Sequence, residues 1–156
     1  MSENPILSIT KQISFEAGHR LPNHNSKCKN LHGHHYVVEF TITGNIQSTA
    51  GASDQGMIVD FSDVKLIADD VIKKPWDHAF FVFKHDRVLV DFLNSLDGHK
   101  TVITEHPPTA EHLAEVAYSK LSHAIRKFYT DRRVVLGCLR LYETPTSWAE
   151  VVASSV

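Results

Sequence analysis

The feature that most constrains this chain is an alternation of side chains in two neighbouring stretches that both contain histidine at one end. Residues 13–19 place apolar side chains on one face of an extended segment and end that face with His19. Residues 32–42 begin with His32 and His34, and apolar residues follow at every second position. Side chains alternate between the two faces of a β-strand. If the two strands pair as a hairpin, the three histidines gather at one end of a shared apolar surface.

Three imidazoles that meet at a strand end indicate a metal site. Histidine is the commonest metal ligand, and three neutral imidazoles with an open fourth position are typical of a catalytic zinc site. Gly33 has no side chain, so another chain segment or a ligand can come close there. A His-x-His pair alone is weak evidence, and a solvated histidine-rich loop is the alternative interpretation.

Composition and length limit the kind of protein. The chain has 156 residues, of which 42% are hydrophobic and 22% charged, as expected for one globular domain over residues 1–156. A net charge of −2 gives no reason to expect a nucleic-acid partner. There is no apolar run that could span a membrane and no signal peptide, so we expect a cytoplasmic protein. Two cysteines do not suggest a disulfide framework. Cys28 is expected to be a free thiol, and Cys138 a small core residue in a strand.

The order of predicted elements favours an α+β domain. Predicted strands cover about residues 9–19, 32–43, 100–104, 135–143 and 148–152, and predicted helices cover about 61–74, 87–96 and 110–128. We expect Pro75 to end the first helix and Thr109 to cap the last one. The residues expected to point inward include Leu89, Phe92, Leu93, Leu96, Leu121, Phe128, Val135, Leu139 and Leu141. Hairpins at both ends with helices between them predict an antiparallel sheet with helices on one face, and oligomerisation would cover its open edges.

Four further residues could carry chemistry. A thiolate at Cys28, flanked by two lysines, would be a base or nucleophile. Asp77 and His78 combine a carboxylate with an imidazole, but adjacent strand residues point opposite ways, and surface residues at a helix end are the simpler interpretation. Glu143 ends an apolar strand face, as His19 does. Its carboxylate could accept two parallel N–H bonds from a flat nitrogen heterocycle, or it could be an exposed strand-end residue.

These motifs together resemble one protein family. They are Phe15-x-Ala17-x-His19, Cys28-x-x-x-His32-Gly-His34, Asp77-His78, Pro108-Thr109-Ala-Glu111 and Glu143-Thr144. In this order, and over nearly the whole chain, they resemble the 6-pyruvoyl-tetrahydropterin synthase family. The three residues between Cys28 and His32 are similar to the bacterial 6-carboxy-5,6,7,8-tetrahydropterin synthase branch, whereas the pyruvoyl-forming branch has a longer gap.

The resemblance implies a tunnelling fold (T-fold), with a four-stranded antiparallel sheet and two main helices on one face. It implies trimers whose sheets close into a barrel, two trimers in a homohexamer, and active sites between subunits. The site residues that it implies are zinc ligands His19, His32 and His34, a proton acceptor Cys28, relay partners Asp77, His78 and Glu143, and a pterin site formed by Glu143 and the backbone near Thr109.

The implied reaction is the conversion of 7,8-dihydroneopterin 3'-triphosphate to 6-carboxy-5,6,7,8-tetrahydropterin, with release of acetaldehyde and triphosphate. In bacteria that product enters the synthesis of 7-deazapurines such as queuosine. Arg20, Lys27 and Lys29 are our candidates for binding the triphosphate. Formation of the pyruvoyl product, or an aldolase-like side activity, is the second interpretation on the same scaffold.

A third interpretation belongs to a different class, a cupin-like metal-binding domain. There Glu39 would join His32 and His34 as a ligand in place of His19. The chain also departs from the family pattern. The segment between His78 and Thr109 is long and includes an extra predicted helix, and Ala-Phe-Phe-Val follows His78 instead of a Leu-Asn sequence.

Overall fold

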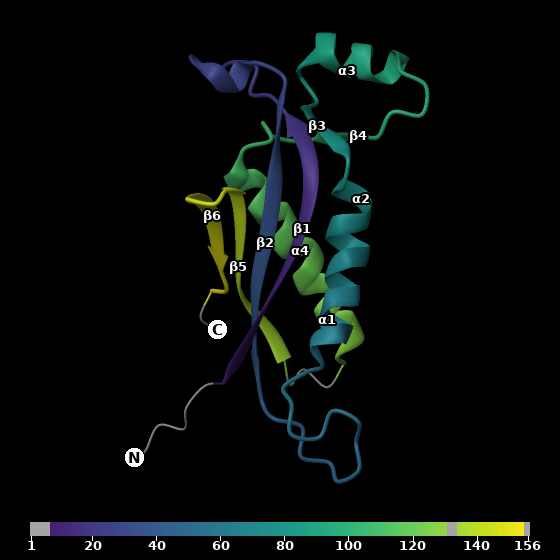
Figure 1. The fold of residues 1–156 in the computed structure, drawn as a ribbon, viewed down its shortest axis with the longest axis vertical. Helices are drawn as coiled ribbons and strands as arrows, with labels where there is room; N and C mark the ends of the chain where they lie inside the picture. Colours follow the sequence, from purple (N-terminus) through teal and green to yellow (C-terminus); the bar gives the residue numbers. More distant parts are fainter. Residues whose placement is uncertain (1–6, 131–133, 155–156) are drawn as a thin grey trace.

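The computed structural model describes residues 7–130 and 134–154, and its centre is one long hairpin (Figure 1). Strand β1 (Ser8–His19) pairs antiparallel with β2 (His32–Gly44) along its whole length, from Ser8 opposite Thr43 to His19 opposite His32. Strand β5 (Val134–Thr144) pairs antiparallel with β2, and β6 (Ser147–Val152) pairs antiparallel with β5. These four strands are the antiparallel sheet that the sequence predicted.

The sheet has six strands rather than the four that the family resemblance implied. The two further strands, of which the second was predicted at residues 100–104, are parallel to their neighbours. Strand β3 (Ala79–Phe83) pairs with the end of β1, and β4 (Thr101–Thr104) pairs with β3, which gives the order β4-β3-β1-β2-β5-β6. Helix α3 (Arg87–Ser95) connects β3 to β4. A parallel pair requires such a crossover connection, and the long segment after His78 supplies it.

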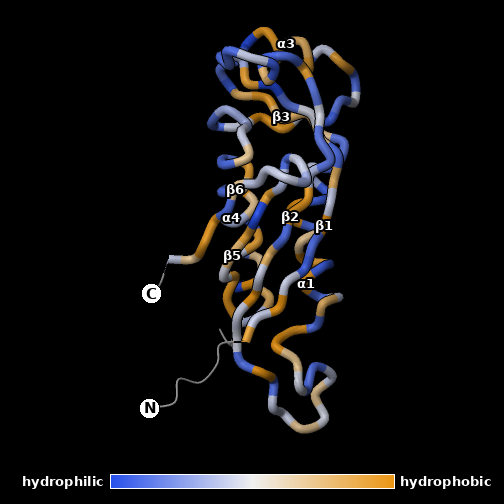
Figure 2. The backbone as a smooth tube through the Cα atoms, turned by 60° about the vertical axis from the view of Figure 1, so that its left-hand side comes forward, coloured by the Kyte–Doolittle hydropathy of each residue, from blue (hydrophilic) through white to orange (hydrophobic). Residues whose placement is uncertain are grey.

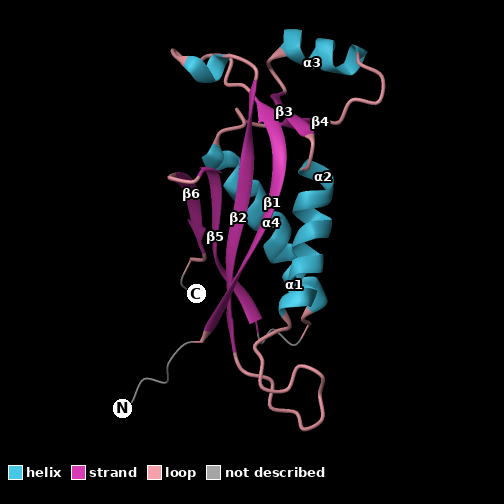
Figure 3. Ribbon diagram, in the orientation of Figure 1, coloured by secondary structure: helices cyan, strands magenta, loops and turns pink. Residues whose placement is uncertain are grey.

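The main helices cover one face of the sheet (Figure 3). A continuous helical segment runs through α1 (Phe61–Ala68), the π-helical turn η2 (Asp69–Lys73) and α2 (Lys74–Trp76), and α4 spans Ala110–Phe128. Asp60 and Thr109 cap α1 and α4 with their side chains, as predicted for Thr109. The helical segment ends at Trp76, one residue after Pro75, which agrees with the predicted end to within one residue.

The core lies between this face of the sheet and the helices, and Figure 2 shows apolar stretches along the facing elements. Every second residue is buried there from residue 13 to 19 of β1 and from residue 36 to 42 of β2, including Phe15, Tyr36 and Phe40. Three side chains that we expected to point inward, Phe92, Leu96 and Phe128, are instead exposed. No helix among the described residues is both long and apolar enough to cross a membrane.

A β-bulge in β5 corrects two further predictions. Leu136 lies opposite Ile42 and Cys138 lies opposite Thr41, so Gly137 is an extra residue and the alternation shifts by one position. Val135 is therefore exposed rather than buried. Cys138 faces away from the helices, where its Sγ lies 3.5 Å from Glu150, and is not a core residue. After the bulge Leu139 and Leu141 are fully buried, as expected.

Helix α3 lies on the other face of the sheet from α1 and α4. The small apolar cluster around it contains Val82, Leu89, Val90 and Leu93, with Phe80 packed against it. Phe81, between Phe80 and Val82, belongs to the main core. Because alternate strand residues point to opposite faces, α3 packs on β3 on the face opposite to the main helices.

Candidate functional site: three histidines at the end of the hairpin

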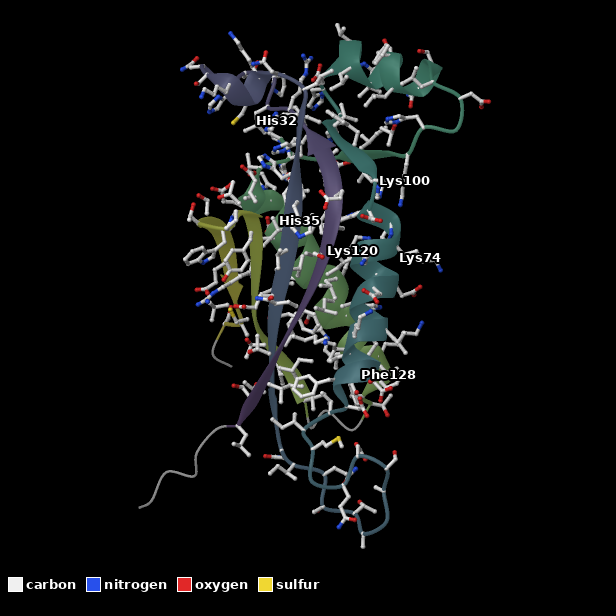
Figure 4. All side chains as sticks on the ribbon, in the orientation of Figure 1. His32, His35, Lys74, Lys100, Lys120 and Phe128 are labelled. Carbon is white, nitrogen blue, oxygen red and sulfur yellow. The ribbon has the colours of Figure 1, made fainter. Side chains whose placement is uncertain are left out.

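Three histidines lie together where β1 ends and β2 begins. His19 is directly opposite His32, and His34 follows on the same face as Tyr36. One nitrogen atom from each ring lies within 4.8 Å of those of the other two, and the ring centroids are 4.5 to 5.1 Å apart. Figure 4 labels His32 at the end of β2 next to the short helix η1 (Lys27–Lys29). The hairpin register predicted from alternation is confirmed.

Backbone carbonyl groups orient two of the three rings. Nδ1 of His19 donates to the carbonyl oxygen of Pro108, and Nδ1 of His32 donates to that of Asn30, both at 2.7 Å. A carbonyl oxygen only accepts, so the proton sits on Nδ1 and the Nε2 lone pair is free. This outer hydrogen bond is the usual support of a metal-binding histidine.

The protonation of the cluster also suits a metal ion. Burial lowers the pKa of His19 and of His34, so both imidazoles are neutral at pH 7. Their Nε2 atoms are buried and have no hydrogen-bond partner in the described part of the chain. Buried polar atoms without a partner are costly, and a divalent cation bound by the three rings would satisfy them.

Glu143 lies beside the histidine cluster. Its carboxylate oxygens are 3.9 Å from Nε2 of His19 and 3.6 Å from Nε2 of His34. The β5–β6 register shifts between Tyr142 and Thr144, and such irregularities often redirect a side chain at a site. The hydroxyl of Tyr36 is buried beneath the cluster, and burial together with the Glu143 charge raises the pKa of this phenol, so it stays a hydrogen-bond donor.

Cys28 lies in η1, on the loop that joins the two strands. Its carbonyl oxygen accepts a hydrogen bond from the Leu21 N–H at 2.8 Å, which ties the two sides of the loop together. The thiol is free and partly exposed. Lys27 and Lys29 on either side are exposed. Cys28 is thus held just before β2, although it is not one of the clustered metal-binding side chains among the described residues.

Asp77 and His78 do pair with each other, unlike two adjacent residues of a regular strand. Nδ1 of His78 lies 3.0 Å from a carboxylate oxygen of Asp77. The pairing is possible because His78 has a left-handed backbone, with φ of 60°. The other oxygen of Asp77 accepts the N–H of Glu16 at 2.9 Å, and this hydrogen bond lowers the pKa of Asp77. The His78 ring is 77% exposed.

His78 does not join the histidine cluster of its own chain. It lines an open depression of about 430 Å³ together with Gly18, Gly33 and His35. Of the three clustered histidines, only His34 lines this depression. Gly18, Gly33 and His35 alternate with the cluster residues and therefore belong to the face away from α1 and α4. In one chain the Asp77–His78 pair therefore lies outside the cluster, and His34 alone reaches the depression that His78 lines.

Nearly the whole chain matches one family. The model of the 6-pyruvoyl tetrahydropterin synthase family covers residues 8–154. The chain belongs to this family. It is 34% identical over 148 residues to the 6-carboxy-5,6,7,8-tetrahydropterin synthase of Haemophilus influenzae, covering 93% of this chain and 98% of that one. It is 32% identical over 146 residues to the enzyme of the same name from Rickettsia typhi, covering 94% and 100%.

A solved structure supports the fold. An uncharacterized protein from Wolinella succinogenes superimposes with a TM-score of 0.78 at 21% identity, covering 97% of this chain and 100% of that one. The predicted α+β T-fold is confirmed, with the correction that its sheet has six strands in this chain rather than four.

The cupin-like interpretation is wrong for this chain. Glu39 faces away from the histidine cluster, where it accepts a hydrogen bond from Gln12 at 2.7 Å and lies 3.5 Å from Arg140. Its odd position in β2 puts it on the opposite face from His32 and His34. It therefore cannot bind the same ion as these two histidines.

Arg20 is not free to bind the triphosphate, contrary to our expectation. Its Nε and Nη2 atoms donate to the two carboxylate oxygens of Asp86, both at 2.6 Å, and Asp86 is buried at the start of α3. This bidentate pair raises the pKa of the guanidinium further. Sequence reasoning missed the pair, because the two residues are 66 positions apart and neither belongs to a motif.

The carbonyl groups of Pro108 and Asn30 were missed for a related reason. Backbone acceptors carry no residue signature. Pro108 does precede the predicted cap of α4, Thr109, and so a turn at this position could have been inferred. That the turn would direct its carbonyl oxygen toward His19, 89 residues earlier, required the fold.

Proposed function

We propose that this chain is a 6-carboxy-5,6,7,8-tetrahydropterin synthase, which converts 7,8-dihydroneopterin 3'-triphosphate to 6-carboxy-5,6,7,8-tetrahydropterin with release of acetaldehyde and triphosphate. The observation that carries the proposal is a set of relatives of that name, 31 to 34% identical over more than 90% of the chain. The cluster of His19, His32 and His34 is consistent with it. The product would then enter 7-deazapurine synthesis, as for queuosine, in the cytoplasm.

The ion that we assign to the cluster is Zn²⁺, held by the Nε2 atoms of His19, His32 and His34. Neutral imidazoles with a fixed tautomer favour zinc. When bound, zinc would supply Lewis-acid polarisation of a side-chain oxygen of the substrate. The carbonyl groups of Pro108 and Asn30 keep the two Nδ1 protons in place, which leaves the Nε2 lone pairs free for the ion.

Three groups of the chain are proposed to handle protons and the pterin ring. Cys28, as a thiolate, would accept a proton from the substrate side chain. Asp77 and His78 would relay that proton, and their 3.0 Å contact supports this role. Glu143 would accept the N–H donors of the pterin ring, with help from the backbone near Thr109. The carboxylate of Glu143 lies close enough to the cluster to hold the ring next to the ion.

We further propose that each active site is built between subunits. His78 is not among the clustered histidines of its own chain, and only His34 of the cluster lines the same depression, so a second copy could supply the relay pair to each cluster. Two open strand edges are available for such an assembly. β3 pairs with β1 only at residues 17–19 and Glu16 bonds to Asp77 and His78, which leaves the edge of residues 8–15 open, and β6 ends the sheet at the other side. Repeated pairing of these edges would close a ring of copies, a trimer or hexamer.

The first experiment identifies the reaction. The protein, loaded with zinc, is incubated with 7,8-dihydroneopterin 3'-triphosphate, and acetaldehyde and the pterin mass are measured. We expect acetaldehyde and the 6-carboxy product in equal amounts. A 6-pyruvoyl product without acetaldehyde would refute the proposed reaction and favour the alternative that the family's name describes. His19→Ala should lose bound zinc, whereas Glu39→Ala should keep it. Cys28→Ala should abolish turnover and retain zinc.

The second experiment tests the site between subunits. Cys28→Ala and His78→Ala chains are each inactive on this proposal, and the two are co-expressed so that they assemble together. If one site takes Cys28 from one chain and His78 from another, roughly a quarter of the sites in random mixtures are intact. Activity should therefore reappear at about that level. Mixed assemblies that stay inactive, although each pure variant binds zinc, would rule out a shared site.

A further inference from the structure

One lysine contacts the chain on both sides of His78. The Nζ atom of Lys100 donates to the carbonyl oxygens of Lys74 and Asp77, both at 2.7 Å. The carbonyl oxygen of Lys100 accepts the N–H of Phe80 at 2.9 Å. Figure 4 shows Lys100 and Lys74 on the same side of the molecule, along α2. Lys100 thus spans the turn that leads from α2 into β3.

This turn needs support because its backbone is unfavourable. His78 is the one residue other than glycine with a positive φ among residues 7–130 and 134–154. The left-handed conformation costs a residue with a Cβ atom about 1 to 2 kcal/mol. The side chain of His78 is mostly exposed, so its own packing does not hold it.

The contacts of Lys100 act on the peptide group that determines φ of His78. The Asp77 carbonyl and the His78 N–H belong to one planar peptide group. The N–H donates to the Glu16 carbonyl oxygen at 2.6 Å, and the carbonyl oxygen accepts from Lys100. Both ends of the plane are therefore held, one by β1 and the other by the ammonium group. The positive charge is also favourable at the carbonyl end of a helix.

We propose that Lys100 is a positioning residue that holds the Asp77–His78 turn in the conformation that presents the His78 ring. The functional part of this proposal rests on the proposed role of His78 in proton transfer. It also assigns a structural role to the long segment after His78. The chain leaves through β3 and α3, turns at Gly98 with φ of +69°, and returns to lay Lys100 across the turn from which it started.

The test compares three substitutions in the zinc-loaded oligomer. Lys100→Met removes the ammonium group and keeps an unbranched side chain, and Lys100→Arg retains a charge with several donors. Lys74→Met is the matched control, because it removes a lysine charge from the same helix end, where the Lys74 side chain is 80% exposed and pairs with Asp70 at 3.5 Å. For each variant we measure kcat, KM, and the hydrogen exchange rate of the His78 and Phe80 amides.

In Lys100→Met we expect both amides to exchange roughly tenfold faster, and kcat to fall roughly tenfold to a hundredfold with little change in KM. Lys100→Arg should recover part of both losses, and Lys74→Met should match the wild type. Unchanged exchange in Lys100→Met would overturn the proposal. Faster exchange with unchanged kcat would overturn its functional part, provided that His78→Ala is inactive. An active His78→Ala would instead refute the proton-transfer role of His78, and the exchange rates alone would decide whether Lys100 holds the turn.

Discussion

Removal of either side chain of the Arg20–Asp86 pair should destabilise the protein by an amount that depends on which charge is left behind. Arg20→Ala leaves a carboxylate whose side chain is only 5% exposed, and an unpaired buried charge of this kind costs about 3 kcal/mol. Asp86→Ala leaves a guanidinium that is 28% exposed and can be hydrated in part, so we expect about 2 kcal/mol. Asp86 makes no side-chain capping bond to α3, so the second substitution does not remove a helix cap.

The double variant separates the interaction free energy of the Arg20–Asp86 pair from the stability that each single substitution removes for other reasons. Once one partner is gone, the other has no bidentate contact to lose, so the coupling free energy should be about 2 kcal/mol. The assay is urea unfolding of the two single variants, the double variant and the wild type. All four are measured at one protein concentration and one zinc load, because oligomers and bound metal shift apparent stability.

A coupling below about 0.5 kcal/mol would refute this reasoning, because that is the level of a solvated surface pair. It would mean that α3 is not anchored to the end of β1 by this contact. Zinc content, measured in the same samples, should be nearly unchanged, because neither side chain contacts the ring nitrogens of the histidine cluster.

Two further predictions concern single polar groups. Tyr36→Phe should leave the free energy of unfolding of the zinc-free protein unchanged or raise it by about 1 kcal/mol. The reason is that the hydroxyl is buried without a hydrogen-bond partner in the described chain. A clear loss of stability in urea unfolding would show that the hydroxyl has a partner. Asp77 has a pKa below its usual 3.8, so its stabilising contribution is complete above that pH and is lost as the pH falls through the lowered value. The stability difference between wild type and Asp77→Asn should therefore be constant above about pH 5 and shrink below about pH 4, and a difference that stays constant down to pH 2 would contradict the assignment.

Much of the candidate site could be predicted from the sequence, because it depends on short-range geometry. Strand alternation alone placed His32 and His34 on one face, and the matching apolar face of residues 13–19 put His19 at the same end once a hairpin was assumed. Glu143 was found by the same argument. The cap at Thr109 is another local feature, since an N-cap depends on residues only a few positions apart.

The errors share a different cause, which is contact between distant segments. The bulge at Gly137 depends on how β5 meets β2, and it moved Cys138 out of the core. The parallel strands β3 and β4 depend on a crossover whose side of the sheet is not encoded in any local pattern. His78 has a left-handed backbone because Glu16 and Lys100 hold its turn from elsewhere in the sequence.

The sequence by itself determined the hairpin, the face on which its three histidines lie, and the Thr109 cap of α4, since all of these follow from the period of two in a strand and from neighbouring residues. Only the tertiary structure decided which carbonyl groups orient the imidazoles, that Arg20 is bound to Asp86, and that His78 pairs with Asp77 outside the cluster. The physical reason is that hydrogen bonds between distant segments have no spacing in the sequence. They exist only after the sheet and its crossover have brought the partners together.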